Sequence, residues 1–179
     1  MIRKTILAAT ALLISSLMFL ATAQDASKAR KLPAVDVKTM DGGKVNTSTF
    51  SNNGKPMIIS FWATWCKPCI QELNAINENY TDWQKETGVK LIAISIDDAK
   101  TSARVAPFVN GKGWSYEIFS DANGDFKREM SVNNPPHSFL LNGKGEIVWQ
   151  HVGFAEGNEK ELYDMLKLVA AGKPIPEQK

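Results

Sequence analysis

Two nearly continuous apolar runs limit most strongly how this chain can fold. They are MIISFW at residues 57–62 and VKLIAISI at residues 89–96. Runs without polar alternation are typical of strands buried on both faces, as in a parallel sheet. Between them, apolar side chains recur at helical spacing: Ile70, Leu73, Ile76, Tyr80 and Trp83. Gly88 follows where a helix should end. The sequence therefore predicts a strand–helix–strand unit, whose crossover is right-handed in nearly all proteins.

Patterns in the rest of the chain predict further elements around this unit. In chain order we expect a hairpin over 33–50, a helix over 102–110, a strand at 116–120, a short helix within 121–130, a hairpin of strands 137–141 and 146–152, and a helix over 159–171. Gly42 and Gly43 supply the positive φ that a tight hairpin turn needs. The predicted fold class is α/β, with a mixed central β-sheet flanked by helices on both faces.

The first 23 residues have the pattern of a secretory signal peptide. Arg3 and Lys4 precede an uncharged apolar run, and Ala21-Thr22-Ala23 ends it with small residues. An uncleaved membrane anchor is the alternative, because the uncharged stretch approaches the length of a spanning helix. In both cases we expect an exported protein that works in the periplasm or elsewhere outside the cytoplasm.

The remaining chain is expected to form one domain with ordinary surface charge. Residues 24–31 and the tail 172–179 are polar and predicted to be flexible, which leaves residues 32–171 as one domain. Without the leader, basic and acidic residues balance at 19 each. This balance gives no electrostatic footprint for nucleic acid.

The chain contains two cysteines, Cys66 and Cys69, directly after the first buried run. As a structural disulfide they would close a four-residue loop, which contributes roughly 2 kcal/mol against ~3 for a 15-residue loop. A structural zinc site needs four ligands, and the chain offers only His137 and His151 besides the cysteines. Neither interpretation fits well.

A redox role fits the position of the pair better. A cysteine at a helix start lies at the positive end of the helix dipole, which lowers the pKa of the Cys66 thiol toward neutrality. Lys67 adds a positive charge, and Pro68 is tolerated in a first helical turn. We expect Cys66 to attack a partner disulfide as the nucleophile and Cys69 to resolve the mixed disulfide.

Three stretches resemble one family. FWATWCKPC at 61–69 with IQE after it, the αβ segment at about 97–120, and PPHSFLLNGKGEI at 135–147 together resemble the extracytoplasmic TlpA/ResA-like thioredoxin-fold thiol–disulfide oxidoreductases. The resemblance covers residues 32–171. It implies a thioredoxin fold with an N-terminal β-hairpin and a central αβ insertion, and a reaction that needs no cofactor.

The resemblance also implies a proton acceptor below the cysteines. Glu72 matches a family glutamate that helps to deprotonate Cys69, although an acidic residue is in any case favoured in the first turns of a helix. Ser60 stands where thioredoxin itself has a buried aspartate, which strengthens the case for Glu72. Asn74 replaces a proline that commonly kinks this helix.

Around the cysteines, the resemblance implies a docking surface. Pro136 matches the cis-proline that faces the cysteines, and the alternative register would make Pro135 the cis residue. Pro135 has no N–H to offer a partner, so one hydrogen bond should be missing. The remaining residues of the expected docking set are Trp65, Lys67, Pro68 and His137. Trp62 is expected in the core, and His151 receives no role.

The function implied by the resemblance is thiol–disulfide exchange with exported proteins that contain cysteines. We expect a reductase, for example of apocytochrome c or copper-site thiols, supplied with electrons by a membrane protein of the DsbD type. One alternative is a disulfide oxidase or isomerase of secreted proteins. Another, from a different class, is a Cu(I)-binding chaperone with Cys66, Cys69 and His137 as soft ligands.

Overall fold

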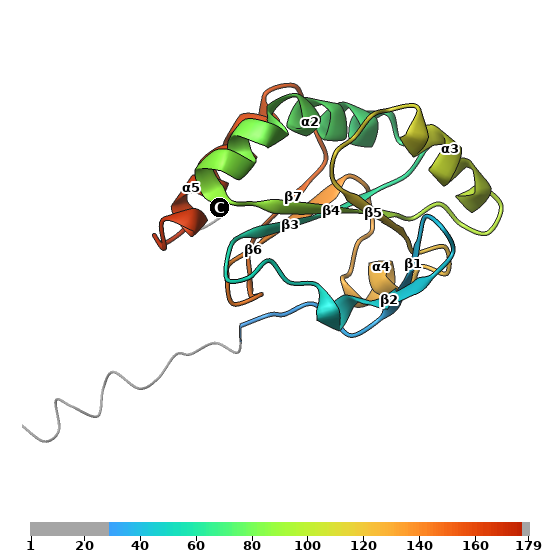
Figure 1. Ribbon diagram of the computed structural model, residues 1–179, viewed down its shortest axis with the longest axis horizontal. Helices are drawn as coiled ribbons and strands as arrows, with labels where there is room; N and C mark the ends of the chain where they lie inside the picture. The colour runs from blue at the N-terminus through green and yellow to red at the C-terminus, as the bar shows by residue number, and fades with distance from the viewer. Residues whose placement is uncertain (1–28, 177–179) are drawn as a thin grey trace, which may run out of the picture.

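A computed structural model describes residues 29–176 of the chain (Figure 1). The predicted leader at 1–23, most of the segment 24–31 and the last three residues lie outside the described residues. Within 29–176, no helix combines the length and the apolar character needed to cross a membrane.

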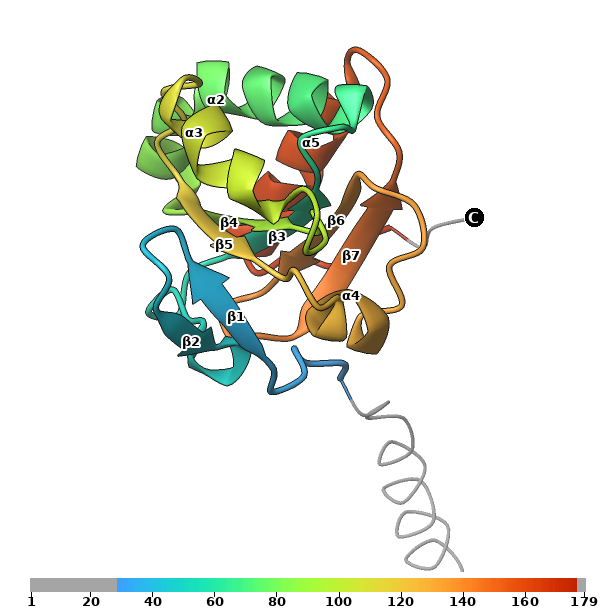
Figure 2. The ribbon, with the colours of Figure 1, turned by 90° about the vertical axis from the view of Figure 1, so that its right-hand side faces the viewer.

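The centre of the molecule is a seven-stranded mixed sheet in the order β2-β1-β5-β4-β3-β6-β7. Its strands are β1 (Asp36–Thr39), β2 (Lys44–Asn46), β3 (Met57–Trp62), β4 (Lys90–Ser95), β5 (Glu117–Ser120), β6 (His137–Leu141) and β7 (Ile147–Val152). β3, β4 and β5 run parallel, whereas β1, β2, β6 and β7 form antiparallel pairs at the two sides. β2 and β7 are thus the edge strands (Figure 2). The predicted strand–helix–strand unit is confirmed.

Helices cover both faces of this sheet, as predicted. They are α2 (Lys67–Thr87), α3 (Val105–Asn110), α4 (Asp125–Glu129) and α5 (Asn158–Ala170), with 3-10 turns η1 (Thr47–Thr49) and η2 (Ser102–Arg104). Figure 1 shows α2, α3 and α5 over one face and α4 over the other. The predicted helix at 102–110 therefore begins as a 3-10 turn and becomes α-helical at Val105.

The core lies on both sides of β3 and β4, whose residues are almost all buried. Leu73 and Ile76 of α2 are fully buried against the sheet, and α2 ends at Gly88 with φ 68°, as its sequence predicts. On the other face, Phe126 of α4 packs against Phe61 of β3. This packing fixes the end of β3, and therefore the chain that follows it.

Residues at both ends of the described range contact the rest of the domain. Arg30 donates to the carbonyl of Met130 at 2.9 Å, and its guanidinium lies 5.6 Å from the centroid of the Phe139 ring. The backbone of Lys31 forms an isolated antiparallel β-bridge with the backbone of Glu146. In the tail, Ile175 is partly buried against the core. The planar guanidinium of Arg30 and the apolar side chain of Ile175 thus bury surface that composition alone does not reveal.

Candidate functional site

The structure places the two cysteines in a disulfide at the beginning of α2. Cys66 is the N-cap residue, and its Sγ accepts a hydrogen bond from the Cys69 backbone N–H at 3.3 Å. Pro68 occupies the first turn, where a missing N–H leaves no carbonyl unpaired. The predicted position at the positive end of the helix is confirmed.

The two cysteines differ in how accessible they are to a partner protein. Cys66 is 5% exposed and Cys69 is 0% exposed. Trp65 next to Cys66 is 59% exposed, and Lys67 and Pro68 are exposed as well. An approaching protein therefore meets Cys66 before Cys69, and it meets a large apolar ring beside it.

Glu72 lies one helical turn after Cys69 and is buried, with 4% of its surface exposed. Ser60 Oγ of β3 and Ser138 Oγ of β6 each donate to one of its carboxylate oxygens at 3.1 Å. These serines face each other across the β3–β6 pair. Burial raises the pKa of Glu72 to about 7, and the two serine hydrogen bonds oppose the rise. A carboxyl poised near neutral pH can both accept and release a proton.

The peptide bond between Pro135 and Pro136 is cis, as predicted, with Pro136 as the cis residue. Pro136 is buried and Pro135 is half-buried. His137 follows as the first residue of β6 and pairs with Phe61 at the end of β3. The strand that follows the cis-proline, β6, therefore begins beside the end of β3, the strand that leads to the cysteines.

His137 lies on the face of the sheet opposite to Glu72, and its place in the docking surface stays a prediction. Because side chains alternate along a strand, it points away from the face where Ser138 meets Glu72. Its ring stacks on Phe139 with centroids 4.2 Å apart, and it is 7% exposed. Nε2 lies 3.3 Å from Gln150 Oε1, and burial lowers the pKa of the imidazole.

The copper alternative requires His137 to lie close to both cysteines. Among residues 29–176, no three His, Cys, Asp or Glu side chains are grouped so that they could bind a metal ion. His137 therefore does not complete a site with Cys66 and Cys69. The sequence could not reveal this, because the face that His137 occupies depends on the register of β6.

A buried carboxylate that the sequence analysis missed supports the loop before Cys66. Asp97, 0% exposed, follows β4. It accepts hydrogen bonds from Thr64 N–H at 2.8 Å, Thr64 Oγ1 at 2.6 Å and Ser95 Oγ at 2.9 Å. Because Thr64 stands two residues before Cys66, Asp97 fixes the chain that presents the nucleophile. A polar Thr directly after a buried strand, with an Asp after the neighbouring strand, is the signal available in the sequence.

We expect Thr64→Val to weaken this support. The variant keeps the side-chain shape but leaves one buried oxygen of Asp97 without a donor, which should lower the free energy of unfolding by about 1–3 kcal/mol. Thr64→Ser retains the hydroxyl and should stay close to the parent protein. Denaturant unfolding of the three proteins measures the difference, and an equal loss in both variants would show that the hydroxyl is not what matters.

Asn74, which stands where the family helix is commonly kinked by proline, makes a specific contact. Its Oδ1 accepts a hydrogen bond from Trp114 Nε1 at 3.0 Å, and α2 runs unbroken from Lys67 to Thr87. Trp114 in turn packs edge-on against Trp62, the buried residue that ends β3. Asn74 thus ties α2 to the segment between α3 and β5.

Comparisons with known proteins agree with this geometry. A model of the AhpC/TSA family matches residues 29–150. The thiol-disulfide oxidoreductase ResA of Bacillus thuringiensis (strain Al Hakam) is 32% identical over 140 residues, which are 78% of this chain and 77% of that protein. An uncharacterized thioredoxin-like protein from Porphyromonas gingivalis is 51% identical with a TM-score of 0.71, covering 78% of this chain and 92% of that one.

A further solved structure carries a functional name. The putative thiol:disulfide interchange protein DsbE from Chlorobium tepidum is 25% identical with a TM-score of 0.68, covering 82% of this chain and 99% of that one. The fold, the cysteine pair at the start of α2 and these similarities lead to one assignment. The chain belongs to the AhpC/TSA family and is a thioredoxin-fold thiol–disulfide oxidoreductase.

Proposed function

We propose that this enzyme reduces disulfides in exported proteins that contain cysteines. The observation that carries the proposal is the burial of Cys66, Cys69 and the Glu72 carboxyl in one place. Strongly oxidising pairs owe their potential to a stabilised reduced form. The positive end of α2 stabilises a thiolate at Cys66. Against this, burial of the pair disfavours a thiolate, and an ionised Glu72 adds a second negative charge below the pair. Both effects favour the disulfide form of the enzyme, which makes its dithiol form a reductant.

In this proposal the reaction runs in two exchanges. The Cys66 thiolate attacks one sulfur of the substrate disulfide and releases the other substrate cysteine as a thiolate, which takes up a proton. Cys69 then transfers its proton to Glu72 and attacks the Cys66 sulfur, which expels the second substrate thiolate. Two electrons pass to the substrate, and the enzyme is left with the Cys66–Cys69 disulfide.

Partner binding is proposed around the exposed side of Cys66. Trp65, Lys67 and Pro68 would contact the incoming chain, and the backbone at Pro135 and Pro136 would lie beside it. Because Pro135 lacks an N–H, it can accept but not donate a hydrogen bond there. One hydrogen bond fewer weakens partner binding by about 0.5–1.5 kcal/mol.

The enzyme is further proposed to act outside the cytoplasm. Support comes from the leader pattern of residues 1–23, and a membrane protein of the DsbD type would return two electrons to the oxidised enzyme. If the leader is removed as predicted, protein from the extracytoplasmic fraction begins at Gln24. Mass spectrometry that finds Met1 retained would favour the membrane anchor instead.

Disulfide transfer to a haem-attachment peptide tests the direction. Pre-reduced enzyme is mixed with an oxidised C-x-x-C-H peptide, and oxidised enzyme with the reduced peptide. We expect the disulfide to move to the enzyme in the first mixture and to stay on it in the second. Net oxidation of the peptide in the second mixture would instead identify a disulfide oxidase or isomerase of secreted proteins.

A further inference from the structure

Two serine hydroxyls lie in strands whose residues are all buried. Ser60 is the one hydroxyl residue of β3, and Ser138 is the one hydroxyl residue of β6. The two serines are 0% and 1% exposed, and they lie directly opposite each other in the β3–β6 pair. A buried hydroxyl costs free energy unless it is hydrogen-bonded. Each serine therefore needs a specific partner inside the domain.

That partner is the carboxyl group of Glu72. Ser60 Oγ donates to Oε2 and Ser138 Oγ donates to Oε1, each at 3.1 Å, so each carboxylate oxygen has its own donor. The donors belong to two strands of the sheet and the acceptor belongs to α2. Rotation of the carboxyl group would break both hydrogen bonds. The serines thus hold the carboxyl group in one orientation.

The orientation of this carboxyl group matters because of its place on α2. Cys69 and Glu72 are three residues apart, so their side chains lie on the same side of the helix. An ionised carboxylate has about four lone-pair sites on its two oxygens, and the serines occupy two of them. The carboxylate that the serines hold can therefore still accept the proton of Cys69.

Burial and the two serines act on the pKa of Glu72 in opposite directions. Burial raises it to about 7, whereas the hydrogen bond from Ser138 and then the one from Ser60 lower it. A hydrogen bond donated to the ionised form of an acid stabilises that form. Without either serine, the carboxyl group would keep its proton to a higher pH, and a smaller fraction of it could accept a proton at pH 7.

Other titratable groups belong to the elements that pack around Glu72: Tyr80 of α2, Tyr116 before β5, Asp97 after β4 and His151 of β7. The two tyrosines are neutral near pH 7 because burial raises the pKa of each phenol. Within residues 29–176, no charged side chain contributes to the raised pKa of Glu72. His151 lies directly opposite Ser138, and a histidine can change its charge near neutral pH, so it needs a control variant.

We propose that Ser60 and Ser138 are positioning residues of the second exchange, which hold Glu72 in place and stabilise the carboxylate that takes the proton of Cys69. In that step the S–H bond of Cys69 breaks and its proton passes to a Glu72 oxygen. The Cys69 sulfur then forms its bond to Cys66 Sγ, and the substrate thiolate leaves with the electron pair of its own bond to Cys66. The inference rests on the proposed function, because it assumes that Glu72 accepts this proton.

Titration of Glu72 in the disulfide form tests the proposal without turnover. NMR of isotope-labelled protein follows the carboxyl-carbon resonance of Glu72, which is identified by its loss in Glu72→Gln. We expect the parent to titrate near pH 7, and Ser60→Ala and Ser138→Ala each to titrate about one pH unit higher, because each loses a hydrogen bond to a charged group. Ser138→Thr keeps the hydroxyl and should titrate like the parent. An unchanged titration in both alanine variants would overturn the proposal.

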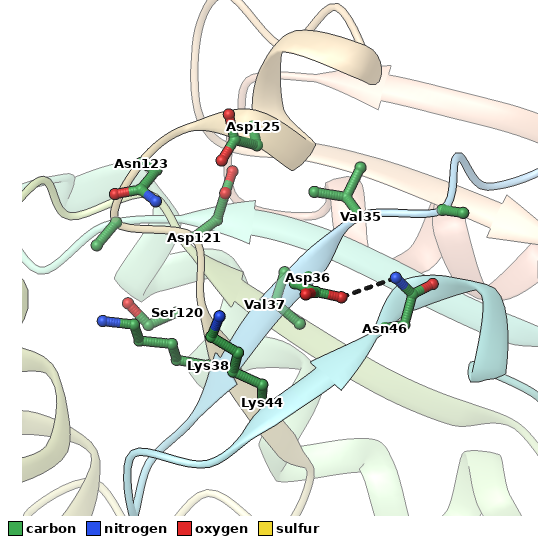
Figure 3. A pocket seen from close by; sticks show the side chains of 12 residues that line it. Val35, Asp36, Val37, Lys38, Lys44, Asn46, Ser120, Asp121, Asn123 and Asp125 are labelled. Atoms are coloured by element: carbon green, nitrogen blue, oxygen red, sulfur yellow. Dashed lines mark hydrogen bonds between the residues drawn. The ribbon is translucent and has the colours of Figure 1, made fainter.

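Two control variants locate the effect. Ser120→Ala is the matched control, because Ser120 lines a hollow beside Lys38, and its strand β5 is separated from β3 by β4 (Figure 3). His151→Gln removes the histidine opposite Ser138. Both variants should titrate like the parent. If Ser120→Ala shifts the titration as far as Ser138→Ala does, or if His151→Gln removes it, the proposal is wrong.

The kinetic consequence is measured with reduced enzyme and the symmetrical disulfide of thionitrobenzoate. The first thionitrobenzoate is released by the attack of Cys66 and the second by the attack of Cys69. In Ser60→Ala and Ser138→Ala we expect an unchanged first release, and a second release that is about fivefold slower at pH 7 but within about twofold of the parent at pH 8. A slowing that is equally large at both pH values would point to structural damage and contradict the proposal.

Combination with Glu72→Gln separates this inference from the proposed function. The serines act through the carboxyl group, so Ser138→Ala should not slow the second release further once Glu72 is an amide. An equal slowing in both backgrounds would overturn the positioning role. If Glu72→Gln alone leaves the second release unchanged, the proposed role of Glu72 itself fails. If Glu72→Gln slows it while both alanine variants titrate and react like the parent, only the role of the serines is wrong.

Discussion

Cys69→Ser should stop the enzyme at the mixed disulfide. Cys66 remains able to attack, because it is the N-cap residue and the more exposed of the two cysteines. Without Cys69 no internal thiol can attack the Cys66 sulfur, so the substrate stays bound through a disulfide and turnover falls to background. Mass spectrometry of the non-reduced protein should show one substrate molecule added per enzyme, and a reductant should release it.

Cys66→Ser is the matched control for this prediction. Its remaining thiol, Cys69, is 0% exposed, so a folded substrate cannot reach it and no adduct should accumulate. If Cys66→Ser captures substrate while Cys69→Ser does not, the two cysteines have the opposite roles. If Cys69→Ser still turns over with an external thiol absent, the internal resolution step is wrong.

Glu72→Gln should change the pH dependence of stability by an amount that is easily measured. The pKa of Glu72 rises from its ordinary value of 4.5 to about 7 in the folded protein because the carboxyl is buried. Below pH 4.5 both folded and unfolded chains hold the proton. Between pH 4.5 and 7 the folded chain holds more protons, so the free energy of unfolding falls as pH rises. The total loss is about 3 kcal/mol, complete above pH 7.

The amide introduced by Glu72→Gln is neutral at every pH, so the variant should lack this loss. It should match the parent near pH 4 and exceed it by up to about 3 kcal/mol near pH 8, provided that the amide bonds to Ser60 and Ser138. Denaturant unfolding of the disulfide forms measures this without titration of the cysteines. Glu78→Gln, on the exposed side of α2, is the control and should follow the parent. Identical pH profiles for all three proteins would contradict the raised pKa.

The same substitution should slow the second exchange selectively. If Glu72 accepts the proton of Cys69, the resolution rate of the parent rises as pH passes about 7, and Glu72→Gln loses that rise and about 10²-fold in rate. The first attack by Cys66 should change little. Stopped-flow kinetics separate the two steps, and an equal loss in both would mean that Glu72 only supports the structure.

Local sequence patterns were sufficient to predict the two central strands and the helix between them. The apolar runs that became β3 and β4 are buried along their length, and the helix between them begins at the cysteines and ends at Gly88. Such elements are predictable because their periodicity and end residues agree. The family resemblance, and not the local pattern, identified Pro136 as the cis residue, since most X–Pro bonds are trans.

Contacts between distant segments were not predictable in the same way. Asp97 and Thr64 are 33 residues apart and meet only because β3 and β4 end side by side. The face of the sheet that His137 occupies was not predictable for a similar reason, because one residue of strand register decides which face a side chain occupies. The pairing of Lys38 in β1 with Ser120 in the insertion strand β5 likewise joins segments that lie far apart in the sequence.

The reduction potential of the Cys66–Cys69 pair tests the central claim most directly. Equilibration of protein lacking residues 1–23 against glutathione or dithiothreitol buffers gives its value. The account predicts a potential near or below about −250 mV, in the region of thioredoxin, because burial and Glu72 disfavour the reduced form of the pair. A potential between about −120 and −180 mV, as in dedicated oxidants and isomerases, would contradict it and identify an enzyme that makes or rearranges disulfides.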